Sequence, residues 1–325
     1  MRSAIHTSFG EPSQVLELSD QPVPNPSTGE VRIKTLLAPI HNHDLWTIRG
    51  SYGYKPALPA IGGSEAVGVV DAVGEGVEGV TVGQRVAVAG VHGTWAEYFL
   101  APANQLVPMP QAIPDEVAAQ LIAMPLSALM LLEFLNVSPG QWIVQNTANG
   151  AVGKTLAMLA SARGVQVLNL VRRDAGVQEL TDLGIAHVLS TAQADWKHSA
   201  SALLGPAQAV AAVDSIGGQA SASLLELLGE GGTLVSFGTM AGEPMQISSG
   251  ALIFKQATVK GFWGSKVSQA MAAQDKRRLL GELLQRTLSG ELKLAAEGIY
   301  DLGDAAQAAA ASLQPGRKGK ILLKP

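Results

Sequence analysis

The sequence predicts an α/β fold in which a doubly wound parallel sheet is combined with a second, β-rich domain. The chain has 325 residues, more than one hydrophobic core usually supports, so two domains are expected. Its N-terminal third consists of short β-like segments separated by Pro and Gly. From Gln141 onward, β-like runs alternate with amphipathic helical runs, which is the pattern of a parallel sheet covered on both faces.

The N-terminal β segments show the residue alternation of half-buried strands. They are Glu30–Lys34, Gly68–Val73, Gln84–Ala89 and Ala96–Leu100. After Pro114 the residue pattern changes, and Glu116–Leu135 carries Ala, Leu and Met at helical spacing. This change predicts the first domain boundary near residue 120.

The central region predicts six strands with intervening helices. Strands are expected at Trp142–Asn146, Gln166–Arg172, Ala209–Asp214, Gly232–Gly238 and Ala257–Phe262, among others, with helices at Val152–Arg163, Gln178–Leu183 and Ala220–Leu228. A long helix around Gln269–Leu288, a helical alanine-rich stretch at Ala305–Ala311 and a closing strand at Lys320–Leu323 follow. We therefore assign residues 121–264 to the doubly wound domain, and residues 1–120 with 265–325 to the β-rich domain.

Composition excludes several classes of function. The 23 basic and 27 acidic side chains give a net charge of −4, and without long runs of like charge neither nucleic acid nor an anionic membrane is an expected partner. No apolar stretch reaches the roughly 20 residues that cross a bilayer, and Met1-Arg2 does not open a secretory signal. The expected compartment is the cytoplasm. With no cysteine in the chain, thiolate metal sites, thiol nucleophiles and disulfides are excluded.

A dinucleotide-binding fingerprint follows the strand Trp142–Asn146. The loop Thr147–Gly153 has Ala148 in the first glycine position and leads into a helix at Lys154. Gly150 is expected to let the backbone approach a pyrophosphate, and Gly153 to permit close packing of helix and strand. The predicted cofactor contacts in this loop are Asn149, Gly150, Ala151, Val152 and Gly153, at a helix N-terminus that favours phosphate.

The residues after the second strand favour NADPH. Arg172 and Arg173 lie about 20 residues after Gly153, where a Rossmann domain places its ribose-binding residue. Two arginines favour a 2′-phosphate over a free 2′-hydroxyl. Asp174 leaves an alternative open, because its carboxylate could bind a ribose hydroxyl instead.

The order of the domains, together with several motifs, resembles the medium-chain dehydrogenase/reductase superfamily over essentially the whole chain. The motifs are Leu58–Glu65, Val73–Val77, Val82–Val86 and Gly319–Leu322. This resemblance implies that the β-rich part is a GroES-like catalytic domain. In the zinc alcohol dehydrogenases of this superfamily, a cysteine lies near the position of His41 and a histidine precedes the glutamate that corresponds to Glu65.

The sequence argues against zinc. Ser64 stands in the position of that histidine, and the chain has no cysteine. His41 and His43 could share a face of an extended strand, but without a third ligand in sight. We expect no metal, and we expect His41, Asn42 and His43 to line the active site or to form hydrogen bonds around it.

Within the superfamily, the chain resembles the zinc-free 2-enoyl thioester reductases of fatty acid synthesis, with quinone reductases as near neighbours. Ile48–Pro56 resembles the substrate loop of these enzymes and places Tyr52 at their proton-donating tyrosine; Leu252–Lys255 followed by Gly261–Trp263 resembles a strand and a Phe-Trp pair beside the nicotinamide. The resemblance implies further cofactor contacts at Phe237, Gly238, Met240, Phe262, Trp263 and Lys320, and a substrate pocket at His41, Asn42, Tyr54 and Trp263. The chain departs from the family at Met124-Pro125, at Gly264 and, in part, at Ser127.

The predicted function is metal-free, NADPH-dependent reduction of an activated carbon–carbon double bond, most simply a trans-2-enoyl thioester, with Tyr52 assisting protonation. Two alternatives stay open: a quinone or enone reductase with the same cofactor, and a non-catalytic NADPH-binding protein. The resemblance also implies a homodimer formed through the edge strand near Ala257–Phe262, an apolar edge that would be a liability if left unpaired.

Overall fold

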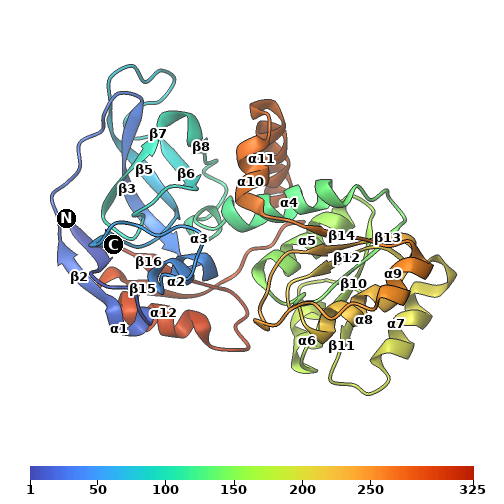
Figure 1. Cartoon of the computed structure of the whole chain (residues 1–325). Helices are drawn as coiled ribbons and strands as arrows, with labels where there is room; N and C mark the ends of the chain where they lie inside the picture. The colour runs from blue at the N-terminus through green and yellow to red at the C-terminus, as the bar shows by residue number, and fades with distance from the viewer. The chain divides into compact units, whose positions relative to one another are not determined.

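The computed structural model describes all 325 residues. The chain divides into two compact units, which are shown in Figure 1. Unit 1 comprises Met1–Ala123 together with Leu294–Pro325, and unit 2 comprises Met124–Lys293. No helix of either unit combines the length and the apolar character that crossing a bilayer requires.

Unit 1 is built mainly from β-strands. Its elements are β1 (Arg2–His6), α1 (Pro12–Val15), β2 (Leu16–Asp20), β3 (Glu30–Pro39), α2 (Asn42–Ile48), β4 (Ala60–Ile61), β5 (Glu65–Val73), β6 (Arg85–Ala89), β7 (Tyr98–Pro102), β8 (Val107–Pro108), α3 (Asp115–Ala118), β15 (Ala296–Asp301), α12 (Ala305–Leu313) and β16 (Lys320–Lys324). One sheet has the order β2-β1-β4; the other has the order β15-β16-β3-β5-β6-β8, with β7 also paired to β3. The expected closing strand is thus confirmed as β16, and it pairs antiparallel with β3.

The core of unit 1 follows from the alternation of its strands. In β3, Val31, Ile33, Thr35 and Leu37 are buried while Arg32 and Lys34 between them are not, because successive side chains of a strand point to opposite faces. The buried strand residues pack with Trp95, which is fully enclosed, and with small residues of α12.

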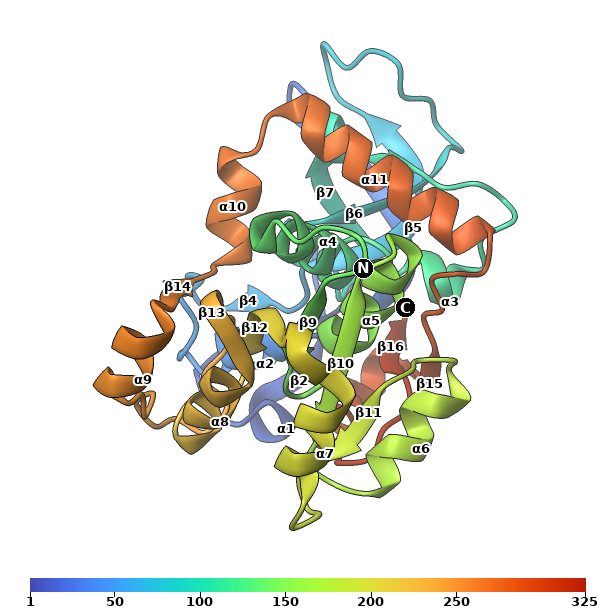
Figure 2. The same cartoon turned by 90° about the vertical axis from the view of Figure 1, so that its right-hand side faces the viewer.

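Unit 2 is a six-stranded parallel sheet with the order β11-β10-β9-β12-β13-β14. Its elements are α4 (Ala123–Leu135), β9 (Trp142–Gln145), α5 (Ala151–Ala162), β10 (Gln166–Val171), α6 (Ala175–Asp182), β11 (Val188–Ser190), α7 (Trp196–Leu204), β12 (Ala209–Asp214), α8 (Gln219–Leu227), β13 (Leu228–Ser236), α9 (Ser249–Lys255), β14 (Thr258–Gly261), α10 (Gly264–Ala270) and α11 (Ala273–Leu288). This strand order is that of a doubly wound Rossmann domain, so the predicted fold class is confirmed. The turned view in Figure 2 shows the sheet strands with their connecting helices.

Two predictions about the region after β14 are corrected. The expected single helix is two helices, because the chain is extended at Met271 between α10 and α11. Both helices also belong to unit 2, so the second boundary lies at residue 293 and not at 264. The sequence pattern showed a helix there but not which core it packs against.

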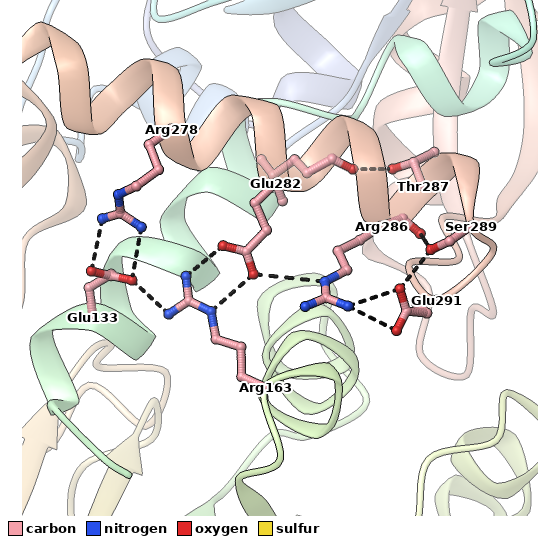
Figure 3. A network of polar contacts seen from close by, with 9 residues as sticks. Glu133, Arg163, Arg278, Glu282, Arg286, Thr287, Ser289 and Glu291 are labelled. Atoms are coloured by element: carbon pink, nitrogen blue, oxygen red, sulfur yellow. Dashed lines mark hydrogen bonds and ion pairs between the residues drawn. The ribbon is translucent and has the colours of Figure 1, made fainter. Parts of the chain in front are cut away.

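Ion pairs attach α11 to the Rossmann unit, as Figure 3 shows. Arg163, at the end of α5, contacts Glu282 of α11 through two nitrogens at 3.0 and 2.7 Å. It also contacts Glu133 of α4 at 2.6 Å, and Glu133 in turn accepts from Arg278 of α11 at 3.1 Å. This three-helix network, together with the buried Leu279 and Leu283 of α11, explains why the second boundary lies later than the sequence indicated.

Candidate active site

The predicted dinucleotide loop connects β9 to α5 in unit 2. Gly150 is the N-cap of α5, and Gly153 has no room for a side chain, since a Cβ there would lie 2.7 Å from the Thr147 carbonyl oxygen and 2.8 Å from Ala148 Cα. Ala148 is fully buried. The loop therefore has the tight turn, the close helix packing and the free helix N-terminus that a pyrophosphate site needs.

A buried carboxylate that the sequence reasoning missed holds the neighbouring strand ends together. Asp214, at the end of β12, has no exposed surface. Its Oδ1 accepts from Asn146 Nδ2 at 2.7 Å and from the backbone N–H groups of Ile216 and Gly217, and its Oδ2 accepts from the Ser221 hydroxyl. Asn146 Oδ1 in turn accepts a hydrogen bond from the Ser215 N–H. The signal available in the sequence was a polar residue at the end of each of two adjacent strands.

The arrangement after β10 favours the two arginines over Asp174 as cofactor contacts. Arg172 is exposed directly after β10, and Arg173 is half-buried beside it. The Asp174 carboxylate accepts hydrogen bonds from Ser190 and Gln193, which hold its pKa below the usual range. Asp174 is thus bonded to the loop after β11, while Arg172 is exposed and the cofactor contact expected of it stays a prediction.

The aromatic segment around β14 divides into a buried and an exposed part. Phe262 is buried and stacks with Phe237 at a centroid distance of 5.9 Å, whereas Trp263 and Met240 are more than half exposed. Gly238 has a close neighbour, because a Cβ there would lie 3.0 Å from the Ser215 carbonyl oxygen. The expected strand at Leu252–Lys255 is wrong, since these residues lie in α9, which Ser248 caps through its hydroxyl.

The expected extended geometry at His41 and His43 in unit 1 is also wrong. His41 is the N-cap of α2, and His43 lies in the first turn of that helix. A capping box explains the turn: Asp44 Oδ2 accepts from the His41 N–H at 2.9 Å. The two imidazole rings stack at 5.1 Å, and the expected pocket residue Asn42 is exposed between them in sequence.

His41 and Glu65 form a fully buried pair beneath α2. His41 Nε2 and Glu65 Oε2 are 2.7 Å apart, and neither side chain has exposed surface. Glu65 Oε1 accepts the backbone N–H groups of Ile122 and Ala123. Burial raises the pKa of Glu65 to about 7 against the effect of those two bonds, and burial lowers the pKa of His41. Burial thus favours the neutral forms of both groups, and His41 is enclosed instead of lining a pocket.

Lys320 of β16 lies close to this pair. Its ammonium donates to the Ile40 carbonyl oxygen at 3.2 Å, and burial lowers its pKa to about 8, although Asp44 and Glu65 oppose the shift. The cofactor contact implied for Lys320 remains a prediction. What the structure gives this ammonium is a partner inside unit 1.

His43 is joined to Ser64 and Asp44 in a chain of short hydrogen bonds. His43 Nε2 is 2.7 Å from Ser64 Oγ, and Ser64 Oγ donates to Asp44 Oδ1 at 2.6 Å. The ring of Tyr52 lies 5.8 Å from the His43 ring, tilted by 30°. Tyr52 is half-buried, on a loop that Gly50 enters with φ +73°. The structure thus places the predicted tyrosine beside a histidine that the sequence reasoning did not make catalytic.

Tyr54 lies further along the same loop and is exposed. Its ring stacks on His92 at 4.2 Å with an interplanar angle of 13°. Each tyrosine of this loop therefore lies next to a histidine ring: Tyr52 next to His43 and Tyr54 next to His92.

The donor atoms of unit 1 do not fit a zinc ion. Among the described residues no group of three or more His, Cys, Asp or Glu side chains could hold a metal. Nε2 of His41 is bonded to Glu65 and Nε2 of His43 to Ser64, and a catalytic zinc needs three protein ligands. No step of the chemistry below is therefore assigned to a metal.

Comparison with known proteins identifies both units. The family model described as alcohol dehydrogenase GroES-like domain matches residues 27–111, and the model described as zinc-binding dehydrogenase matches residues 151–279. The chain is 33% identical to the human mitochondrial enoyl-[acyl-carrier-protein] reductase, over 99% of this chain and 88% of that protein. Two solved mycobacterial structures each match all of both chains at 28% identity: a quinone oxidoreductase with a TM-score of 0.89, and a protein complexed with NADPH with a TM-score of 0.87.

These matches cover both units and agree with the strand order of the two units. The zinc in one family description has no counterpart in the donor set of this chain. The chain belongs to the medium-chain dehydrogenase/reductase superfamily, and it is an oxidoreductase related to the enoyl-[acyl-carrier-protein] reductases and the quinone oxidoreductases.

Proposed function

We propose that this protein reduces the activated double bond of a trans-2-enoyl thioester with NADPH and without a metal. The observation that carries the proposal is the position of Tyr52, half-buried on a glycine-entered loop beside His43. A relative that is 33% identical over nearly the whole chain bears the name enoyl-[acyl-carrier-protein] reductase, and its substrate class supports this choice.

The choice of NADPH rests on unit 2. The loop at Gly150 and the N-terminus of α5 provide backbone N–H groups for a pyrophosphate. Arg172 is free at the end of β10 while Asp174 is bonded elsewhere, which favours a 2′-phosphate. When bound, the reduced nicotinamide supplies the hydride. A related structure at 28% identity was solved with NADPH, which agrees with this choice.

Unit 1 contributes hydrogen-bond donors and a proton. Hydride addition to an enoyl thioester leaves negative charge on the thioester oxygen and requires a proton at the α-carbon. The Tyr52 hydroxyl is the donor that we assign to the carbon. Tyr54 and Asn42 are exposed near it on the same unit and are proposed to contact the substrate.

Quinone reduction is the second candidate function, and the name of the mycobacterial quinone oxidoreductase favours it. A quinone accepts the same hydride, but both of its reduced positions are oxygens, so no proton is delivered to carbon. Tyr52 would then shape the site without being required for chemistry.

The test is NADPH oxidation with crotonyl-CoA and, in parallel, with benzoquinone. Loss of the Tyr52 hydroxyl in Tyr52→Phe is expected to reduce kcat for crotonyl-CoA by about 10²–10⁴-fold, the usual contribution of a general acid. Tyr98→Phe, on β7, is the matched control and should retain full activity. Turnover of benzoquinone alone, unaffected by Tyr52→Phe, would replace the enoyl proposal with the second candidate. An absence of turnover with both substrates would favour a non-catalytic NADPH-binding protein.

A homodimer through β14 is proposed with this function. All four residues of β14 are exposed at the edge of the sheet, and Ile253 and Phe254 of the preceding α9 are 69% and 86% exposed. An unpaired edge strand next to two exposed apolar side chains is normally covered by a second chain. Sedimentation equilibrium should give twice the chain mass for the wild type, and Val259→Lys should shift it toward the monomer; a monomeric wild type would contradict the proposal.

A further inference from the structure

The hydrogen bonds around His43 fix which ring nitrogen carries the proton. The Ser64 hydroxyl has one proton, and it donates that proton to Asp44 Oδ1 at 2.6 Å. A carboxylate can only accept, and a hydroxyl that donates to it is left with lone pairs for its other neighbours. Ser64 Oγ therefore accepts from His43, whose Nε2 lies 2.7 Å away and must carry a hydrogen.

Asp44 is held in a position where it can keep this chain oriented. Its side chain is 3% exposed, and its second oxygen accepts the His41 N–H that closes the capping box of α2. The carboxylate is thus fixed by the backbone of the same helix that carries His43. Asp44 therefore orients the His43 ring indirectly, through the Ser64 hydroxyl.

The other nitrogen of His43 is available. No hydrogen-bond partner of Nδ1 is present among the described residues, and 26% of the side chain is exposed. The ring lies next to Tyr52, 5.8 Å between centroids, and is backed on its other side by His41. Nε2 keeps its hydrogen, and Nδ1 is therefore the ring nitrogen that can take up a proton from solvent and release it next to the residue at which the substrate is expected.

We propose that His43 is a second catalytic acid, whose Nδ1–H protonates the substrate oxygen on which negative charge collects after hydride addition, with Ser64 and Asp44 as positioning residues. This rests on the proposed function and deepens it, because it requires a substrate with an electron-accepting carbonyl oxygen. The N–H bond at Nδ1 breaks and an O–H bond forms. The ring is left neutral with its hydrogen on Nε2, and a solvent proton restores Nδ1.

The substrate class follows from this assignment. A conjugated thioester becomes an enol at its oxygen. When Tyr52 then delivers its proton to the α-carbon, the enol O–H bond breaks and that proton is released to solvent as the carbonyl re-forms, so one proton is consumed per turnover. A quinone keeps the proton as an O–H of its hydroquinone. A hydrocarbon double bond without a conjugated carbonyl would give His43 nothing to protonate, so such compounds are excluded as substrates.

The first test reads the ring directly and needs no turnover. In ¹⁵N-labelled, NADPH-bound protein, long-range ¹H–¹⁵N spectra distinguish the two neutral imidazole tautomers, and the signal absent from His43→Ala identifies His43. At a pH at which the ring is neutral, as it is after proton transfer, we expect the Nε2–H form in the wild type and a mixture of both forms in Ser64→Ala. Two results would overturn the proposed orientation of His43 by Ser64 and Asp44: a wild-type ring with its hydrogen on Nδ1, or a Ser64→Ala ring that keeps the wild-type tautomer.

The second test uses chemical rescue. His43→Ala should lower kcat by about 10²-fold or more, and added imidazole should restore a large part of it because the missing ring is partly exposed. Tyr52→Phe should not be rescued, and His198→Ala, at an exposed position on α7, should have full activity with or without imidazole. Full activity in a folded His43→Ala, or a loss that imidazole leaves unchanged, would contradict the catalytic role.

The two tests separate the two proposals. If the wild type reduces neither substrate, the proposed function fails, while the tautomer still decides whether Ser64 and Asp44 orient His43. If turnover is present but the tautomer is wrong, the proposed orientation fails and the proposed function stands.

Discussion

Glu65 in unit 1 and Asp214 in unit 2 are both carboxylates without exposed surface, but they are stabilised differently. Asp214 has donors at both oxygens, among them a side-chain amide and a hydroxyl. Glu65 has two backbone donors at one oxygen and an imidazole at the other. Burial raises the pKa of Glu65 to about 7. A side-chain amide does not ionise near neutral pH, whereas an imidazole can.

Asp214 thus carries a fixed charge, whereas Glu65 shares a hydrogen bond with a group that can gain or lose a proton. In unit 2 the carboxylate connects strand ends beside the dinucleotide loop, where rigidity keeps the donors oriented toward a phosphate. In unit 1 burial shifts the pKa values of Glu65, His41 and Lys320 toward the neutral forms of all three groups. The carboxylate of unit 2 is therefore held by groups that do not ionise, whereas that of unit 1 is surrounded by groups that can gain or lose a proton.

The largest effect is expected from breaking the fixed charge. Asp214→Ala leaves buried donors from Asn146, Ser221 and the 216–217 backbone unpaired, and should cost about 3–5 kcal/mol of unfolding free energy. Urea unfolding followed by circular dichroism measures it. Asp195→Ala, at an exposed carboxylate with no side-chain cap bond, should change stability by less than about 0.5 kcal/mol. A small effect of Asp214→Ala would refute the claim that this carboxylate organises the strand ends.

The raised pKa of Glu65 predicts that the free energy of unfolding depends on pH. The folded pKa of Glu65, about 7, lies above its unfolded value, so its contribution is fully present below the unfolded pKa and is lost as pH rises through about 7. Glu65→Gln keeps an acceptor for both backbone N–H groups and removes the ionisation. As pH rises from the unfolded pKa of Glu65 to about 7, the variant should gain stability relative to the wild type, by about 3 kcal/mol at most.

Urea midpoints of both proteins at a series of pH values test this. His41 is present in both, so the difference between them isolates Glu65. A difference that is constant with pH would show that Glu65 does not titrate in this range.

Packing at the phosphate loop should have an intermediate effect. A Cβ in Gly153→Ala would meet the Thr147 and Ala148 backbone, and overpacking of this kind costs about 1–3 kcal/mol. NADPH affinity, measured by fluorescence titration, should fall with it. Gly281→Ala is a matched control on α11 with nothing within 4 Å of the new Cβ; it should stabilise the helix by roughly 0.5–1 kcal/mol. The comparison fails if both substitutions have the same sign.

The smallest effect is expected from the ion pairs of Figure 3. Arg163 and Glu282 are about a fifth exposed, so solvent screens the pair, and Arg163→Ala should cost only about 1 kcal/mol. Hydrogen exchange in α11 should accelerate more than in the sheet, because the arginine joins α11 to α5. In 1 M salt the Debye length falls to about 3 Å, from about 10 Å at 0.1 M, so the loss should shrink. A loss unaffected by salt would indicate packing by the aliphatic stem instead.

The fold was predictable from the sequence because periodicity reports which face of an element is buried. The strands β9, β10, β12, β13 and β14 were expected in the right order, and β11 is the short sixth strand. The second domain boundary was not predictable, because amphipathicity shows that α11 packs but not against which unit. The partners of Arg163 lie on α4 and α11, far apart in sequence.

The candidate site was only partly predictable. The loop at Gly150 and Gly153 and the arginine at the end of β10 have fixed spacings that a sequence shows directly. Asp214 and Glu65 could not be found in this way, because the reason for burying a carboxylate is its set of donors, and these come from other strands. His43 was read as part of an extended segment, so its connection to Ser64, 21 positions away, was missed.

The path of the chain between the units has a consequence for exchanging parts of this protein. Unit 2 is a single insertion whose two ends leave unit 1 at Ala123 and Leu294. Within unit 1 these exits are held close together, because Gln120 Nε2 donates to the Ala295 carbonyl oxygen at 3.3 Å while Glu65 binds the Ala123 N–H. The two points at which the chain leaves and re-enters unit 1 are therefore adjacent. We expect that a related domain can replace unit 2 between these two positions without changes to the hydrogen bonds inside unit 1.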